Sequence, residues 1–235
     1  MPRPLFMGDV VLRCQRRADQ EGQSVITPPE WKSLISEQYA QLYSVVVKAG
    51  MRYFEATAPI IATGAASYPL PIDHDETIGI DRVDPSGRTV QLRELQVQER
   101  NRWSGQTGNA ESYSLVGQAV VLFPRPSSGT YQHVYVPQSP DLSSLSDAST
   151  VDVVTGDGEA FLIWGVAAKA LPKTESDPTM AIQEREAANA RFAEDVGLRA
   201  LVNPRRRVVM PGGGGYGGDY DDDWLARDPG DWRNR

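Results

Sequence analysis

Apolar residues recur at steps of three and four over residues 27–50, which is the spacing of one helical face. The stripe consists of Trp31, Leu34, Ile35, Leu42, Val45, Val46 and Ala49. Thr27 precedes the stripe as a capping residue, with Pro28 at the first helical position and Glu30 three residues after the cap. Gly50 follows the last apolar position, as glycine often does after a helix. The pattern predicts a helix of about twenty residues with one buried face.

Helical patterns return in the last third of the chain. Residues 157–173 are apolar on nearly all faces and predict a buried helix, with Asp157 as its cap. Asp177 and Pro178 then begin an alanine-rich, charge-laced helix of about 24 residues, which an Asn-Pro pair ends. A shorter helix is expected near the N-terminus, over 9–19.

Between these helices, residues 51–137 carry aromatic and β-branched residues broken by proline and glycine. Residues 77–94 predict a β-hairpin that turns at 84–87. Three further short strands are expected over 112–137, separated by a Gly-Gln turn and by the sequence PRPSSG. Residues 95–103 fit one or two helical turns. The segment is therefore strand-rich.

Together the patterns predict an α+β fold, namely a helical bundle with a β-rich insert lobe and an extended C-terminal arm. The helical ends of the chain can pack together only if the insert folds as a lobe of its own. The expected parts are 1–50 for the N-terminal helices, 51–137 for the insert, 138–202 for the C-terminal helices and 203–235 for a flexible extended tail.

Charge and composition narrow the possible partners. The net charge is −7. Residues 203–235 hold six Arg and six Asp, so the whole net negative charge lies in residues 1–202. An acidic body argues against tight, sequence-independent binding to nucleic acid. The longest apolar run has nine residues, which is too short to span a membrane. The single cysteine excludes an intrachain disulfide, and the N-terminus lacks the apolar core of a signal peptide, so we expect a protein of the reducing cytoplasm.

Catalytic and metal-binding patterns are weak. Asp73, His74, Asp75 and Glu76 are adjacent, but neighbouring residues of an extended chain point in different directions, so a solvated acidic loop is the preferred interpretation. His133 lies in an alternating strand and is expected to face solvent or a neighbour. Cys14 is expected to be a packed thiol, because no histidine is placed by the sequence to activate it. Neither a catalytic motif nor a cofactor motif with the required context is present, so we predict no enzyme, no metal site and no cofactor.

The tail has an unusual composition for a linker. Three arginines precede four consecutive glycines, and aromatic residues spaced by aspartate follow. Aromatic anchors on a flexible segment suit ordering on a partner. The candidate docking residues of this arm are Arg205, Arg206, Arg207, Tyr216, Tyr220, Trp224 and Trp232, with Trp224 and Trp232 as leading anchors.

Three segments, in this order, resemble the head-to-tail adaptor (connector) proteins of tailed bacteriophages. The first is the opening LRCQRRADQEGQSVITPPEWKSLISEQYAQLYSVVVKAG, a short helix, a turn and a capped helix. The second is SYSLVGQAVVLFPRPSSGTYQHVYVPQSPDLSSLSD, whose strands end in FPRP and YVP. The third is GDGEAFLIWGVAAKALPKTESDP, a buried helix that a long charged helix follows. The likeness covers about residues 5–202 and does not include the tail.

The resemblance implies a structural virion protein, not an enzyme. It implies a ring of identical subunits, typically a dodecamer, beneath the portal in the neck of the virion, assembled in the host cytoplasm. It further implies contacts with tail or nozzle proteins, a C-terminal segment that engages the portal, and DNA that passes through the bore without sequence-specific contact. An acidic wall suits that passage because it repels phosphates.

A ring requires two different contact faces on each subunit. The long helix after Asp177 is alanine-rich and able to pack closely on a neighbour, although a solvated face is an equal alternative. Its candidate ring-interface residues are Glu184, Arg185, Glu186, Arg191, Glu194 and Asp195. Two other functions stay open: a monomeric virion or surface interaction module with a ligand-binding β-rich lobe, and a hydrolase acting through Asp73, Asp75 or Glu76.

Overall fold

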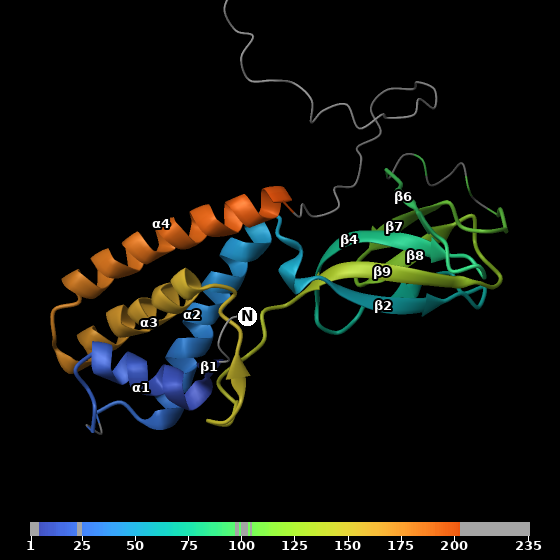
Figure 1. Ribbon diagram of the computed structural model, residues 1–235. Helices are drawn as coiled ribbons and strands as arrows, with labels where there is room; N and C mark the ends of the chain where they lie inside the picture. The colour runs from blue at the N-terminus through green and yellow to red at the C-terminus, as the bar shows by residue number, and fades with distance from the viewer. Residues whose placement is uncertain (1–4, 23–24, 97–98, 100–102, 104, 203–235) are drawn as a thin grey trace, which may run out of the picture.

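Helices gather at one end of the molecule and most of the strands gather at the other (Figure 1). The computed structural model describes residues 5–22, 25–96, 99, 103 and 105–202. Within them, the predicted mixture of helix and sheet is confirmed, and the fold is α+β. The predicted arm, 203–235, lies outside the described residues, as does most of the stretch 95–103 for which helical turns were expected.

Helices from both ends of the chain pack against one another. The N-terminal part supplies α1 (Met7–Arg17) and α2 (Pro28–Lys48), and the C-terminal part supplies α3 (Gly156–Ala170) and α4 (Thr179–Val202). α3 contacts the other three helices, and nine of its fifteen residues are buried. Its central place explains why its sequence is apolar on nearly all faces.

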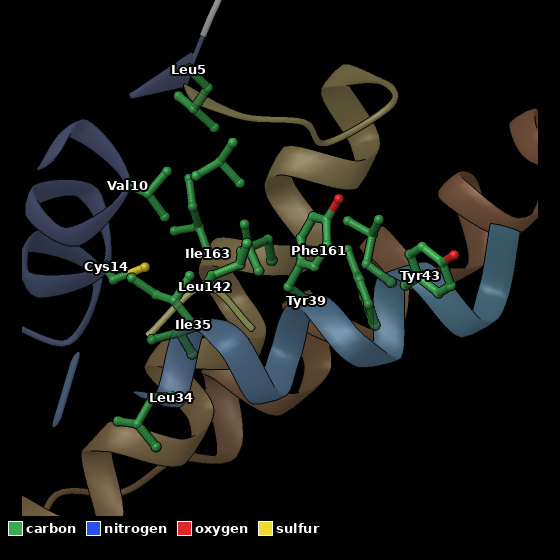
Figure 2. Packing of buried hydrophobic residues seen from close by; sticks show 14 of the residues in the cluster. Leu5, Val10, Cys14, Leu34, Ile35, Tyr39, Tyr43, Leu142, Phe161 and Ile163 are labelled. Carbon is green, nitrogen blue, oxygen red and sulfur yellow. The ribbon is translucent and has the colours of Figure 1, made fainter. Parts of the chain in front are cut away.

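A hydrophobic cluster fills the space between these helices. Figure 2 shows Val10 and Cys14 from α1, Ile35 and Tyr39 from α2, and Phe161 from α3 converging on one space. All five residues are buried. Burying a side chain of this size contributes roughly 1.5–3 kcal/mol. The apolar stripe predicted over 27–50 is therefore the face of α2 that enters the core, as expected.

The strand-rich part contains two four-stranded sheets. The first sheet has the order β2 (Ala56–Ile61), β9 (Thr130–Pro137), β4 (His74–Val83), β5 (Thr89–Gln91), and all its pairs are antiparallel. The second has the order β3 (Tyr68–Pro69), β8 (Ala119–Phe123), β7 (Ser112–Val116), β6 (Arg93–Glu94), with β6 and β7 parallel. The hairpin β4–β5 and the three strands over 112–137 are confirmed.

The two sheets share a second hydrophobic cluster. It includes Ile60, Ile80, Tyr113, Leu122 and Tyr131. At the base of the sheets, Ile78 of β4 and Val136 of β9 belong instead to the helical cluster. The Tyr43 hydroxyl of α2 also donates a hydrogen bond of 2.5 Å to the carbonyl oxygen of Pro137. The strand-rich part thus has its own core and is joined to the helices at the start of β4 and the end of β9.

Short elements complete the description of the fold. β1 (Leu5–Phe6) pairs antiparallel with β10 (Thr150–Val151), next to the start of α1. Two 3-10 helices, η1 (Arg52–Phe54) and η3 (Leu171–Thr174), follow α2 and α3. η3 and the turn after it reverse the chain between α3 and α4.

The predicted helix starts depend on capping side chains. At α2, the backbone N–H of Thr27 bonds the Glu30 carboxylate, but the Thr27 side chain makes no capping bond. The Lys173 ammonium, which bonds the same carboxylate, is the main cause of the lowered pKa of Glu30, and the Thr27 N–H lowers it further. At α4, Asp177 caps the helix as predicted, because its carboxylate accepts hydrogen bonds from Thr179 N (2.9 Å) and Thr179 Oγ1 (2.6 Å).

The predicted cap of α3 is wrong. The N-cap is Thr155, whose Oγ1 accepts a hydrogen bond of 3.1 Å from Gly158 N. Asp157 lies inside the first turn, and its carboxylate faces Arg191 of α4 at 3.4 Å. Both residue types are good caps, so composition alone cannot choose between them. The choice is made by the extended backbone of Thr155 and by the neighbouring helix that engages Asp157.

Replacing this cap is expected to cost measurable stability. Thr155→Ala removes an acceptor from a nearly buried N–H group, so we expect the free energy of unfolding to fall by about 1 kcal/mol. Thr155→Ser keeps the hydroxyl and is expected to stay close to the unchanged protein. Denaturant titration followed by circular dichroism measures both variants. Equal losses for alanine and serine would show that methyl packing, and not the capping bond, matters at this position.

Candidate interaction surfaces

The outward side of α4 is a long exposed surface. The inward side of this helix is buried through Ala181, Ala188, Phe192, Val196 and Ala200. The opposite side, here called the α4 outer face, carries the exposed apolar residues Met180, Ala187, Ala190, Ala193, Leu198 and Leu201. Met180 is 66% exposed and Leu201 78%. Small residues in the middle allow a second backbone to approach closely, and the large side chains stand at both ends of the face.

The six charged residues predicted for a ring contact all lie on α4, but four of them already have charged partners within the subunit. Arg191 faces Asp157 of α3 at 3.4 Å, and Asp195 pairs with Arg199 one turn later at 3.0 Å. Arg185 lies 3.9 Å from its neighbour Glu186, at the limit of an ion pair. Glu194 is exposed and Glu184 is half-buried. Their contact with a second copy stays a prediction.

The residues predicted for the docking arm cannot be placed. Arg205, Arg206, Arg207, Tyr216, Tyr220, Trp224 and Trp232 all lie outside the described residues. The described part of the chain ends at Val202, the last residue of α4. The arm therefore begins where the α4 outer face ends, and its docking partner remains a hypothesis.

A groove of about 490 Å³ separates part of α2 from part of α4 and is here called the α2–α4 groove. Its lining residues are Ala40, Gln41, Ser44, Val45 and Lys48 from α2, Phe161 from α3, and Arg185, Glu186 and Asn189 from α4. Two cations and one carboxylate therefore line an opening whose walls also include apolar side chains. The side-chain oxygen of Asn189 is buried without a hydrogen-bond donor.

The structure brings the two histidines together where the strands meet the helices. His133 is buried, with 1% of its surface exposed, so of the two expected alternatives the exposure to solvent is wrong and its ring faces neighbouring side chains. Its ring stacks on Tyr135 at 5.0 Å and lies 5.4 Å from the ring of His74. Nε2 of each histidine lies within hydrogen-bond distance of Thr77 Oγ1, at 2.8 Å for His74 and 3.0 Å for His133.

The environment of this cluster favours the uncharged form of His133. Burial lowers the pKa of His133 to about 4, and the charge on His74 contributes in the same direction. One hydroxyl can donate to only one acceptor, so in the neutral state one imidazole accepts from Thr77 and the other donates to it. Burial and the hydrogen bond to Asp73 raise the pKa of the Tyr135 hydroxyl, which donates to Asp73 Oδ1 at 3.1 Å. The arrangement links the base of β4 to β9 through side-chain hydrogen bonds.

The other candidate chemical groups do not converge. Within the described ranges, no group of three or more His, Cys, Asp and Glu side chains is able to hold a metal ion. Asp75 and Glu76 are exposed, whereas Asp73 bonds Tyr135. Cys14 is a packed thiol as predicted, and burial raises its pKa. None of the helices in the described part of the chain is long and apolar enough to cross a bilayer.

Sequence reasoning missed the histidine cluster and the groove for the same reason. Both depend on elements that are distant along the chain: β4 with β9, and α2 with α3 and α4. The sequence placed His133 in a predicted strand but assigned His74 to an acidic loop before the predicted hairpin, whereas the structure places His74 at the start of β4. The two positions become informative only once the pairing of β4 with β9 places Ile80 opposite His133 and His74 opposite Pro137.

Comparison with known proteins gives one match. The model of the family described as SU10 adaptor protein matches residues 8–212, which include nearly all the helices and strands described above. A search of curated proteins found no match.

Proposed function

Because the chain belongs to the SU10 adaptor family, a family of structural phage proteins, we propose that its subunits form a ring that joins the portal vertex to the tail. The observation that carries this proposal is the family match over residues 8–212. An adaptor associates with other head or tail proteins, so its function depends on the surfaces that contact them. In the described residues, the α4 outer face is the surface best suited to such contacts.

The ring contact is proposed to use the α4 outer face. A ring forms when one face of a subunit binds a different face of the next and the rotation closes. Ala187, Ala190 and Ala193 let a neighbour approach closely, while Leu198 and Leu201 at the end of the helix are large enough to be anchors. Glu194, which is exposed, is available for an ion pair with the neighbour.

Two further parts of the proposal concern DNA and the portal. Residues 1–202 carry the whole net charge of −7, and such a surface lets a duplex slide through a bore because it does not grip phosphates. The arm with Trp224 and Trp232 as anchors is proposed to dock on the portal or on an adjacent subunit. Its aromatic residues can bury a large area at modest entropic cost.

The proposal is tested by measuring mass in solution and by imaging the protein with portal. The full chain is expected to form a closed oligomer at micromolar concentration, alone or once portal is added. Leu198→Asp combined with Leu201→Asp is expected to raise the concentration needed for assembly about tenfold or more, because truncated anchors at an interface typically cost over 1 kcal/mol each. Sedimentation velocity gives the masses, and electron images give ring closure.

A matched control separates the interface from a general effect of charge. Ile61 on β2 is 69% exposed, as apolar as the two leucines, and far from α4. Ile61→Asp is expected to assemble normally. Assembly that is unaffected in the Leu198/Leu201 variant would rule out the α4 outer face. A chain that stays monomeric and ignores portal at micromolar concentration would contradict the adaptor function itself.

A further inference from the structure

The α2–α4 groove combines apolar side chains with positively charged ones. Its apolar surface comes from Val45 and Phe161, and its positive charge comes from Lys48 and Arg185. Glu186 is the one carboxylate in the lining, so the groove carries a net charge of +1 in a chain whose net charge is −7. A volume of about 490 Å³ lies in the range of roughly 300–1,000 Å³ that is usual for binding pockets.

The wall of the groove also contains Asn189, whose side-chain oxygen is closed to solvent and is therefore out of reach of an occupant in this conformation. The recognition chemistry of the groove comes from its other lining residues. The groove offers an apolar surface and two cations in a single place.

The chain itself contains a segment with the complementary chemistry. Residues 216–224 read YGGDYDDDW and hold three aromatic residues and four aspartates, with no Lys or Arg. The aromatic rings match the apolar surface, and the aspartates match Lys48 and Arg185. We propose that residues 216–224 bind in the α2–α4 groove of their own subunit.

The length of the connection supports binding within one subunit. Asn189 lies 13 residues before the end of α4, a distance of about 20 Å along the helix. The 13 residues from 203 to 215 can span at most about 45 Å, which is enough to return along α4 to the groove. A tethered segment within reach has an effective concentration in the millimolar range, far above that of a second copy at micromolar concentration. The same segment is then unavailable to other partners until it leaves the groove.

The proposal is tested on the full chain by zero-length carbodiimide cross-linking and mass spectrometry. The amine of Lys48 is expected to be joined to an aspartate of 219–223. Lys173 and Glu30, which form an ion pair in the described part of the chain, provide an internal control, because their link should form whenever the helices are folded. An equal mixture of chains with natural nitrogen and nitrogen-15, at low micromolar concentration, should give links only within one isotopic form.

Two tail variants test which aromatic residue anchors the segment. Trp224→Ala is expected to lower the yield of the Lys48 link at least about fivefold, because an aromatic residue that fills a pocket carries a large share of the binding energy. Trp232→Ala, in the same tail but outside the segment, should leave that yield unchanged.

Three results would overturn the proposal. The first is a Lys173–Glu30 link without any link from Lys48 to the tail. The second is an equal effect of the two tryptophan variants. The third is a Lys48 link found mainly between isotopically different chains, which would assign the groove to the arm of a second copy. Because no outcome requires portal or a ring, the experiment can fail while the adaptor function holds, and the reverse is also true.

Discussion

Gly158→Ala is expected to lower the free energy of unfolding by about 3 kcal/mol, at the upper end of typical overpacking effects. A Cβ atom at this position would overlap the backbone oxygen of Val153 and lie 3.0 Å from Cε2 of Phe192. Val153 cannot move away easily, because its carbonyl oxygen accepts a hydrogen bond of 2.6 Å from Thr155 N. Phe192 is fully buried, so α4 would have to shift as well.

Gly156 provides a matched control one half-turn earlier. It lies in the first turn of the same helix, and a Cβ atom there would have nothing within 4 Å. Gly156→Ala is therefore expected to be neutral or slightly stabilising, since alanine favours the helix over glycine by up to about 1 kcal/mol. Guanidinium titrations of both variants, followed by circular dichroism, give the two free energies. Similar values for the two variants would show that the start of α3 yields easily and that its contact with Val153 is not tight.

The helices were predictable because their signals are local. Thr27 with Pro28 and Asp177 with Pro178 mark the starts of α2 and α4, and the stripe beginning at Trp31 marks the buried face of α2. The start of α3 was misassigned because Thr155 and Asp157 are both good caps. What decides between them is the neighbouring helix, where Arg191 engages Asp157. Where the local sequence allows two capping residues, the contact with the neighbouring helix determines which one caps α3.

The strands were predictable individually, but their arrangement was not. The turns at Gly87 and Gly117 specify the hairpins β4–β5 and β7–β8, since both glycines adopt positive φ. The order β2-β9-β4-β5 depends instead on pairing between strands more than forty residues apart. Alternation of side chains along a strand says which face is buried and nothing about which strand lies next to it.

The candidate surfaces were likewise predictable where one segment forms them and not where several distant segments do. The charged residues from Glu184 to Asp195 were found from one helix and are indeed on α4. The α2–α4 groove needs side chains from three helices, and no pattern within one segment indicates it. The histidine cluster needs two strands and was missed. For His133 the sequence left solvent and a neighbour as alternatives, because strand alternation cannot show that Tyr135 and His74 pack against its ring.

Acidification is expected to destabilise the protein through His133. Its pKa is about 4 in the folded protein and about 6.5 in the unfolded chain, so between these values the unfolded chain takes up a proton that the folded protein does not. The stabilisation is therefore complete above pH 6.5 and is lost as the pH falls toward 4. The shift corresponds to about 3 kcal/mol in full, and to about 2 kcal/mol between pH 7.5 and pH 5.

Carboxylates also titrate in this range. The test is therefore the difference in the free energy of unfolding between the unchanged protein and His133→Gln, measured by guanidinium titration at pH 7.5 and pH 5. The glutamine variant is expected to lose about 2 kcal/mol less over that interval, because it has no proton to gain. His74→Gln should keep most of the pH dependence, since burial outweighs the charge on His74 in lowering the pKa of His133. If His133→Gln and the unchanged protein had parallel pH dependences, the ring of His133 would have to accept a proton in the folded state. Thr77 Oγ1 would then accept from the protonated His133 while its hydroxyl donates to His74, and burial makes the charged His133 ring costly.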